Sequence, residues 1–483
     1  MMDITSLLPW LVIVLNIFFA IIVIFRERRD IGSSWAWLLV LFFIPLLGFV
    51  LYLLCGQNLR RYYLFQWEDR KKIGTEKTLG TQLSQLRSPH LQFHNQAVRE
   101  SRDLIYMHLM NSSAVLTEDN SVELFIDGQE KFDRLFKDIE GAKVHIHLQY
   151  FIIKKDQLGK KLIEVLTKKA KEGVRVRVLY DDLGSWRLTK HFFQKLRESG
   201  GEVEAFFPSK FRLINLRLNY RNHRKLVIID GKVGYVGGFN VGNEYLGQDP
   251  KLGYWRDTHL RIQGTAVHSL QTRFILDWNQ ASYYHKNIYI SNHFPEAVSQ
   301  GDVGIQIVTS GPDSEWEYIK NGYIKMISLA KKSVLIQTPY FVPDTSLLEI
   351  LRIACFSGVE VKIMIPNKPD HIFVYWATLS YIGELLKAGA TVYIYDNGFI
   401  HAKIIIVDGK ISSVGTANID VRSFKLDFEV NAFLYNEEFA QRLTKTFEED
   451  VKVSRELTLD QYQQFPLWVR FKESISRLLS PLL

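Results

Sequence analysis

The sequence predicts a duplicated α/β protein, with two similar units related by a pseudo-twofold axis behind an α-helical transmembrane hairpin. Three observations lead to this fold class. Two long uncharged stretches lie near the N-terminus, strand and helix patterns alternate from residue 114, and one unusual segment occurs twice. The expected divisions are a two-span hairpin over 1–59, a juxtamembrane linker over 60–113, a first unit over 114–295 and a second over 296–483.

The N-terminal region contains two stretches that are long enough to cross a bilayer as helices. Neither Leu7 to Phe25 nor Trp35 to Cys55 carries a charged side chain, and a hydrocarbon core of about 30 Å needs about 20 apolar residues. A cleaved signal peptide fits poorly, because no Lys or Arg precedes the first stretch and a second stretch follows at once. The excess of Lys and Arg after the second stretch favours a cytoplasmic body.

Composition narrows the class of partner. Of the 483 residues, 47% are hydrophobic, which is ample for a large core, and the formal net charge is +8. A basic balance favours nucleic acid, an anionic membrane surface or a phosphorylated substrate. With two cysteines in the whole chain, a disulfide framework and a cysteine-based zinc site are both excluded.

Strand and helix patterns alternate in the remainder of the chain, as in a mainly parallel α/β sheet. Residues 143–153 and 174–182 have the β-branched, alternating character of strands, and the amphipathic stretch between them ends at Gly173. The whole segment 149–182 is matched in pattern by 338–370. The chain is therefore expected to contain an internal duplication.

The repeated segment spans residues 223–240 and 401–418. In each copy a His and a Lys two residues apart stand before an apolar run, and a turn-forming Asp-Gly and a later Asn follow at matching offsets. Side chains two apart on a strand share a face, so each His and Lys should point the same way. The members are His223, Lys225, Asp230 and Asn240 in the first copy, and His401, Lys403, Asp408 and Asn418 in the second.

Brought together, the two copies would form one pocket with two His, two Lys and two Asn. Two imidazoles can supply one nucleophile and one general acid, and lysine is a point charge suited to phosphate oxygens. The set can break and remake a phosphodiester through a covalent phosphohistidine. A single pair is typical of an ordinary strand end, but its repetition favours a shared site. For Asp230 and Asp408, the turn position favours a structural role over direct catalysis.

A nucleophilic His works best when an acceptor holds its other ring nitrogen. Asp257 follows the first copy in a strand-like segment, and Glu429 follows the second, with Asp427 as an alternative. We expect Asp257 and Glu429 to orient the histidines. A surface salt bridge is the competing interpretation.

At these residues the chain resembles the phospholipase D superfamily, whose hallmark is a duplicated His-x-Lys-x4-Asp-x6-Gly-(Gly/Ser/Thr)-x-Asn motif. Both copies match at every position. With its two-span N-terminus, the chain is similar to the bacterial cardiolipin synthases over essentially its whole length. The resemblance implies catalytic His223, Lys225, Asp230, His401, Lys403 and Asp408, with phosphate bound by Lys225, Asn240, Lys403 and Asn418.

The reaction implied by this resemblance joins two phosphatidylglycerol molecules into cardiolipin and releases glycerol. His223 would be the nucleophile and His401 the general acid and then base, with the reverse order left open. Neither a metal nor another cofactor is implied. The implied partners are the anionic phospholipids phosphatidylglycerol and cardiolipin in the bacterial cell membrane, not nucleic acid, and a homo-oligomer is compatible with the sequence.

Other functions remain as alternatives. A membrane-bound phospholipase D would hydrolyse phospholipid to phosphatidic acid, and a related phosphatidyltransferase would use another alcohol. The basic charge permits a superfamily nuclease, but two membrane spans argue against it. Intact His and Lys in both copies argue against a non-catalytic scaffold. The basic, apolar stretch from Pro208 to Lys225 is expected to rest on anionic lipid.

Overall fold

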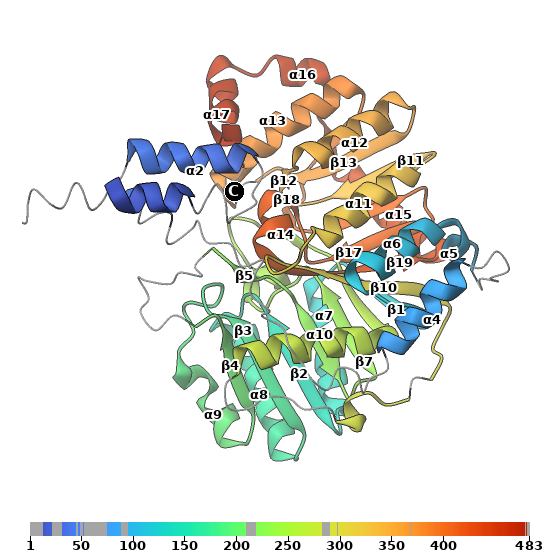
Figure 1. The fold of residues 1–483 in the computed structure, drawn as a ribbon. Helices are drawn as coiled ribbons and strands as arrows, with labels where there is room; N and C mark the ends of the chain where they lie inside the picture. The colour runs from blue at the N-terminus through green and yellow to red at the C-terminus, as the bar shows by residue number, and fades with distance from the viewer. Residues whose placement is uncertain are drawn as a thin grey trace, which may run out of the picture.

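The computed structural model describes residues 13–21, 31–44, 47–48, 52, 75–87, 95–208, 219–282, 290–296, 298–368, 370–478 and 480 (Figure 1). Strands from both halves of the chain form one 16-stranded sheet with the order β20-β14-β13-β11-β16-β17-β19-β10-β1-β9-β7-β6-β2-β3-β4, and β5 pairs with β19 off this path. The duplicated α/β fold that the sequence predicts is confirmed. The expected mainly parallel order is wrong, because parallel pairing is confined to β2-β3-β4 and β11-β13-β14, and the other neighbours on this path pair antiparallel.

The strands of the first half are β1 (Leu116–Phe125), β2 (His145–Tyr150), β3 (Arg175–Asp181), β4 (Glu202–Phe206), β5 (Arg221–Asn222), β6 (Leu226–Ile229), β7 (Val233–Gly237), β8 (Trp255–Arg256) and β9 (His259–Gln263). Those of the second half are β10 (Val303–Ser310), β11 (Ser333–Gln337), β12 (Phe341–Val342), β13 (Glu360–Pro366), β14 (Thr391–Tyr395), β15 (Phe399–Ile400), β16 (Ile404–Val407), β17 (Ile411–Gly415), β18 (Ile419–Asp420), β19 (Asp427–Tyr435) and β20 (Ser454–Glu456).

The pseudo-twofold relation is visible in the strand order. At the centre of the sheet β1 and β10 pair antiparallel, with Leu116 opposite Gln306. Outward from this pair the order is β9-β7-β6-β2-β3-β4 on one side and β19-β17-β16-β11-β13-β14 on the other. Corresponding strands of the two halves therefore lie at equal distances from the centre.

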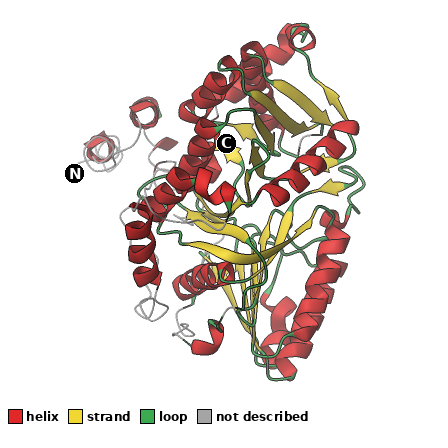
Figure 2. Ribbon diagram, turned by 90° about the vertical axis from the view of Figure 1, so that its right-hand side faces the viewer, coloured by secondary structure: helices red, strands yellow, loops and turns green. Residues whose placement is uncertain are grey.

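Helices cover both faces of the sheet (Figure 2). Those of the first half are α7 (Gly128–Gly141), α8 (Gln157–Lys171), α9 (Gln194–Glu198) and α10 (Ala266–Ala281). Those of the second half are α11 (Tyr318–Leu329), α12 (Thr345–Phe356), α13 (Ile372–Ala388), α14 (Val421–Lys425), α15 (Glu437–Lys452), α16 (Leu459–Gln463) and α17 (Leu467–Leu478). The segment before the sheet contributes α2 (Ile31–Phe43), α4 (Thr75–Arg87), α5 (Gln96–Glu100) and α6 (Arg102–Ser112).

Local sequence sets the ends of the duplicated helices α8 and α12. Asp156 accepts a hydrogen bond from the backbone N–H of Gly159 at 3.0 Å, and Asp344 accepts one from Leu347 at 3.0 Å, so each carboxylate caps a helix start. Gly173 and Gly358 follow the helices with φ of 88° and 82°, a conformation that favours glycine. Both halves thus use the same start and stop residues.

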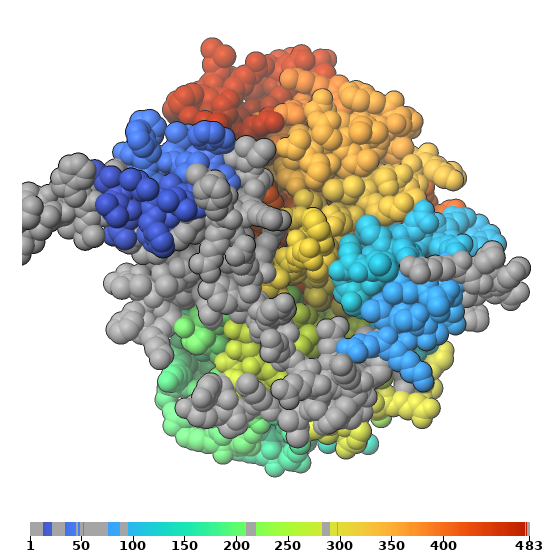
Figure 3. Space-filling view, viewed as in Figure 1, coloured from blue at the N-terminus to red at the C-terminus, as the bar shows by residue number. Residues whose placement is uncertain are grey.

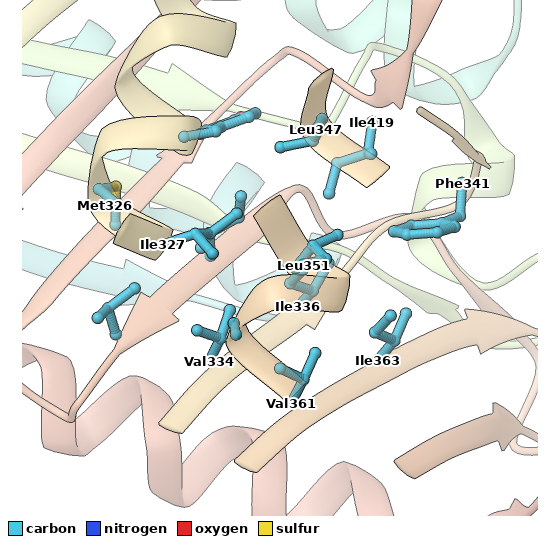
Figure 4. Packing of buried hydrophobic residues seen from close by; sticks show 14 of the residues in the cluster. Met326, Ile327, Val334, Ile336, Phe341, Leu347, Leu351, Val361, Ile363 and Ile419 are labelled. Atoms are coloured by element: carbon cyan, nitrogen blue, oxygen red, sulfur yellow. The ribbon is translucent and has the colours of Figure 1, made fainter. Parts of the chain in front are cut away.

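The core of the second half lies between α11 and α12 on one side and β11 and β13 on the other (Figure 4). Met326, Leu351 and Ile336 are among its buried side chains. A second core is shared by the two halves, because α10 and α15 pack against strands from both. The shared core joins the halves into one body.

Residues 13–21 and α2 are helical. Residues 13–21 fall within the first predicted span, and α2 begins at Ile31, four residues before the second. The rest of the first span, Leu7 to Phe25, and part of the second, Trp35 to Cys55, lie outside the described residues. Among the helices that are described, none has the length and apolar character needed to cross a bilayer. Of the expected lipid-contacting stretch 208–225, residues 209–218 also lie outside the described part.

Asp230→Ala is expected to lower the free energy of unfolding by about 1–3 kcal/mol, because three backbone N–H groups lose their acceptor. The Asp230 carboxylate accepts from Lys143, Val144 and His145 at 2.8, 2.8 and 2.9 Å, and its φ is 54°. Thermal unfolding followed by circular dichroism measures the change. Asp230→Asn is the matched control, since Asn tolerates positive φ and keeps one acceptor. Equal midpoints for Asp230→Ala and the unchanged chain would contradict this role.

Candidate active site

Two short strand pairs cross between the halves immediately before the motif histidines. β5 of the first half runs parallel to the start of β19, with Asn222 opposite Phe428. In the same way β15 of the second half runs parallel to β8, with Ile400 opposite Arg256. In each pair, the residue after the paired position is a motif histidine on one strand and a predicted carboxylate residue on the other. The register therefore brings these side chains together.

Each histidine is held by a carboxylate from the other half. His223 Nδ1 lies 2.8 Å from Glu429 Oε1, and His401 Nδ1 lies 2.6 Å from Asp257 Oδ2. A carboxylate accepts the Nδ1–H of its imidazole, which leaves Nε2 as the nitrogen that can meet a substrate. The structure thus places Asp257 and Glu429 beside the histidines, in an exchanged arrangement.

Backbone contacts fix the same positions. The His223 N–H donates to the carbonyl of Phe428 at 3.0 Å, and the His401 N–H donates to that of Arg256 at 2.7 Å. All four side chains of the two pairs are buried. The imidazoles therefore sit on rigid backbone and approach reacting atoms in a fixed orientation.

Each motif lysine directly precedes a strand, β6 or β16, and its side chain turns back to the histidine of the same motif. Lys225 Nζ donates to the carbonyl of His223 at 2.7 Å, and Lys403 Nζ donates to that of His401 at 2.6 Å. Both ammonium groups are buried. The Phe151 ring packs edge-on against His223, with ring centroids 4.9 Å apart, which gives this side of the pocket an apolar wall.

The electrostatics of the site follow from burial and from the crowding of like charges. Burial, then Lys225 and Lys403, lowers the pKa of His223 well below its ordinary value. Burial, then Lys403, lowers the pKa of His401 to about 4. The influence of Lys403 on His223 indicates that the two copies share one site. Both imidazoles are neutral at pH 7 when no anion is present.

The lysines and carboxylates are shifted as well. Burial lowers the pKa of Lys225 to about 7 and that of Lys403 to about 8. Burial also raises the pKa of Glu429 to about 7. For Asp257, burial opposes ionisation, but His401 and Lys403 outweigh it and hold the pKa below its ordinary value.

The two carboxylates are supported differently. Thr416 Oγ1 donates to Glu429 Oε2 at 2.5 Å. The corresponding residue of the first copy is Gly238, where a Cβ would lie 1.9 Å from Asp257 Oδ1. The variable motif position therefore matches the carboxylate of its own half: a hydroxyl serves Glu429, and the absence of a side chain leaves room for Asp257.

The motif asparagines are buried, and one is already engaged. Asn240 accepts from the backbone N–H of Ile152 at 3.1 Å and donates to the Tyr245 hydroxyl at 3.0 Å. Asn418 differs, because its Oδ1 has no hydrogen-bond partner among the described residues. The side-chain oxygen of Asn418 can therefore still accept a hydrogen bond, whereas that of Asn240 is used within the fold.

Asp230 and Asp408 are not brought into the site, which corrects their place in the predicted catalytic set. Each stands beyond the end of the strand that starts next to its motif lysine, β6 or β16. Asp408 accepts from the backbone N–H groups of Lys331, Lys332 and Ser333 at 2.9, 2.7 and 2.9 Å, as Asp230 does in the first half. The turn position that favoured a structural role explains this placement.

Sequence reasoning missed two buried arginines that tie the crossing strands in place. Arg224 donates to both oxygens of Asp277 at 2.8 Å and to the carbonyl of Glu429 at 3.1 Å. Arg256 binds Asp450 at 2.8 Å. What could have indicated them in the sequence is an Arg within a segment that otherwise has the pattern of a buried strand. The rival carboxylate Asp427 pairs instead with Arg422 at 3.3 Å.

This geometry is that of a duplicated phosphodiester-transfer site of the phospholipase D type. A family model described as "Cardiolipin synthase, PLD-like domain" matches residues 135–278 and 323–451, and one described as "Phospholipase_D-nuclease N-terminal" matches residues 14–57. The chain belongs to the cardiolipin synthase family of phospholipase D-like proteins.

Individual relatives agree with this assignment. The chain is 70% identical to the major cardiolipin synthase ClsA of Bacillus subtilis (strain 168) and 55% identical to a cardiolipin synthase of Listeria monocytogenes serotype 4a, with 100% of each chain covered. The phosphatidylserine synthase structure from Haemophilus influenzae Rd KW20 aligns with a TM-score of 0.60 at 16% identity, covering 80% of this chain and 100% of that one. This last likeness shows the fold alone.

The affinity of the site for sulfate, used here as a simple oxyanion probe, is expected to fall at least about tenfold between pH 6 and pH 9. Sulfate keeps its charge over this range, whereas Lys225 and Lys403 lose theirs. A lysine is charged below its pKa and neutral above it, and the pKa values of Lys225 and Lys403 are about 7 and 8. Isothermal titration calorimetry on the full chain measures the effect. The Lys225→Arg, Lys403→Arg variant should show a flatter profile, since guanidinium stays charged. A pH-independent affinity in the unchanged protein would contradict the lowered pKa values.

Proposed function

We propose that the chain is a cardiolipin synthase, which transfers the phosphatidyl group of one phosphatidylglycerol to the terminal hydroxyl of a second and releases glycerol. The observation that carries this proposal is the pair of buried histidines held by Glu429 and Asp257 at 2.8 and 2.6 Å, each with a motif lysine beside it. Full-length likeness to cardiolipin synthases supports the choice of substrate.

The first step forms a phosphorus–nitrogen bond and breaks a phosphorus–oxygen bond. His223 Nε2 attacks the phosphorus of the donor lipid, and His401 gives a proton to the departing glycerol oxygen. The lowered pKa of His223 keeps its imidazole neutral and nucleophilic. Glu429, bonded to Nδ1, orients the ring and stabilises the positive charge that develops on it.

The second step reverses the roles around the same phosphorus. His401, now neutral, takes the proton from the terminal hydroxyl of the second phosphatidylglycerol. The resulting oxygen attacks phosphorus, the bond to His223 breaks, and cardiolipin leaves. No separate energy source takes part, because one phosphodiester bond is exchanged for another.

Protonation of His401 is coupled to substrate binding. Burial and Lys403 lower the pKa of His401 to about 4. An anionic phosphodiester beside it favours the imidazolium and raises this pKa. The same anion keeps Lys225 and Lys403 charged, and the two lysines hold its oxygens together with Asn240 and Asn418.

The organisation of the chain follows the same proposal. The protein is a membrane protein of the bacterial cell membrane, with a two-span hairpin over 1–59, a linker over 60–113 and a cytoplasmic body of two halves, 114–295 and 296–483. The uncharged N-terminal stretches and the match of residues 14–57 to an N-terminal family model support the hairpin. Its lipid partners are phosphatidylglycerol and cardiolipin.

Incubation of the purified chain with phosphatidylglycerol vesicles in excess EDTA is expected to yield cardiolipin and glycerol in equal amounts. Transfer of a phosphatidyl group from one phosphatidylglycerol to another through a histidine needs no metal. Mass spectrometry of lipid and water-soluble products measures both. Phosphatidic acid without cardiolipin would move the assignment to a membrane-bound phospholipase D. A lipid product that forms only after a different alcohol is supplied to the vesicles would indicate another acceptor.

The His401→Ala variant is expected to trap a phosphatidyl group on His223 when the substrate is phosphatidyl-p-nitrophenol. This leaving group departs without a proton, so the first step survives the loss of the general acid, whereas the second step loses its base. A burst of p-nitrophenol close to one equivalent of enzyme, followed by slow turnover, is the expected record. Peptide mass spectrometry locates the adduct.

Two further variants control this experiment. His223→Ala should give no burst; a burst there, with the adduct on His401, would reverse the two roles. Asp257→Asn should resemble His401→Ala although Asp257 lies in the other half, because its carboxylate holds His401. Asp427→Asn is the matched control, since that carboxylate pairs with Arg422.

A further inference from the structure

The helix α17 is amphipathic in an inverted sense, with its apolar residues turned away from the protein. Leu467, Trp468 and Leu478 are 84%, 64% and 78% exposed, whereas Glu473 is 4% exposed. At 100° per residue the exposed apolar side chains fall within an arc of about 100°, opposite the buried polar ones. The members of this apolar face are Leu467, Trp468, Phe471, Ile475 and Leu478.

Polar contacts hold the other side of α17 against the protein. The Tyr462 hydroxyl donates to Glu473 Oε2 at 2.9 Å. Arg477 forms an ion pair with Glu384 of α13 and lies over the ring of Tyr381, 4.8 Å from its centroid. The orientation of the helix is therefore fixed by buried charge and hydrogen bonds, and its apolar face points outward as a consequence.

The apolar face begins beside the rim of the active site. Contacts between α13 and α17 advance in the same direction along both helices, from Trp376 with Lys472 to Tyr381 with Arg477. The first turns of the two helices therefore lie at the same end. At that end α13 exposes Ile372 and Phe373.

Asp370, two residues before α13, connects this turn to the catalytic centre. Asp370 accepts a hydrogen bond from the Tyr340 hydroxyl. Its charge also acts on Lys403, where it opposes the fall in pKa that burial causes. The exposed apolar start of α13 thus lies next to Asp370, whose charge reaches Lys403.

Charge around the apolar face indicates what covers it. The helix places Lys472 on one flank of the arc and Arg470 on the other, with Arg477 one step further. Lys472 Nζ lies 5.4 Å from the centroid of Trp468, a pairing of aromatic ring and cation that suits the boundary between acyl chains and headgroups. The acidic residue of α17, Glu473, is buried on the side of the helix opposite the apolar face. An apolar stripe with cationic edges matches an anionic bilayer surface.

The position of α17 agrees with this occupant. In the one view shared by Figures 1 and 3, α17 and the apolar helix α2 are both drawn in the upper left part of the molecule. On α2 the side chains of Trp35, Phe42 and Phe43 are exposed. α2 and α17 thus each contribute exposed apolar side chains.

We propose that α17 lies on the membrane as an interfacial helix, with its apolar face at the acyl-chain boundary and its flanking basic side chains against anionic headgroups. The site then opens at the bilayer surface, where a phosphatidylglycerol headgroup reaches the lysines while its acyl chains stay in the membrane. The anionic character of the lipid rests on the proposed function. The contact itself rests on the geometry of α17.

Lipid contact is tested with a fluorescent label at one position of the full-length chain in vesicles of phosphatidylglycerol and phosphatidylcholine. Phe471→Cys carries the label in a Cys55→Ser, Cys355→Ser background, and Glu164→Cys on α8 is the matched control, because it is exposed on the opposite end of the molecule (Figure 1). Lipids brominated along the acyl chain should quench the label at 471 severalfold more than the label at 164. Equal quenching at the two positions would overturn the proposal. So would a disulfide between the Phe471→Cys residues of two unlabelled chains, because it would show that the apolar face meets a second copy.

A second measurement separates surface contact from chemistry. Trp468→Ser combined with Phe471→Ser should lower cardiolipin formation on vesicles about fivefold or more, and leave the rate on monomeric short-chain phosphatidylglycerol unchanged. Equal rates on vesicles would overturn the proposal. Because quenching needs no turnover, a quenched but inactive protein would refute the proposed function and leave the membrane contact standing.

Discussion

The site depends on the two short strand pairs that cross between the halves, β5 with β19 and β15 with β8. In each of them a short parallel pairing fixes the residues just before a histidine against those just before a carboxylate. A shift of one residue in either pair would turn the side chains to opposite faces and separate the imidazole from its acceptor. The two halves are therefore bound by the same hydrogen bonds that bring the motif histidines to their carboxylates, and in each described pair the histidine and the carboxylate come from different halves.

Burial of so many ionisable groups is the second feature of the design. Two lysines, two histidines and two carboxylates share a volume from which solvent is largely removed. Burial lowers the pKa values of the cationic groups and raises that of Glu429, so these side chains together carry less charge at neutral pH than the sequence suggests. An anionic phosphodiester supplies the missing charge and restores the cations. Substrate and protonation state are thereby linked, which suits a reaction that needs one neutral and one protonated imidazole.

The route of the substrate joins the catalytic centre to the surface of the protein. α13 begins next to Asp370 at the edge of the site and packs along its length against α17. If α17 lies on the membrane, the same helix pair that supports the second half also sets the distance between bilayer and catalytic lysines. A lipid with a small headgroup then reaches the site without leaving the membrane, and this restricts the positions that its phosphorus can adopt.

Much of this protein is determined by local sequence. The spacing of the two motifs, the alternation of strand and helix and the duplication depend on patterns along the chain, and the sequence alone predicts them. Tertiary structure alone decided that Asp257 serves His401 and Glu429 serves His223, because strand pairing between distant segments leaves no periodic trace in the chain. It also decided that Asn240 is engaged within the fold, that Arg224 and Arg256 brace the crossing strands, and that the apolar side of α17 faces outward. Each of these depends on contacts between residues far apart in sequence, and local patterns of hydrophobicity and charge carry no record of such partners.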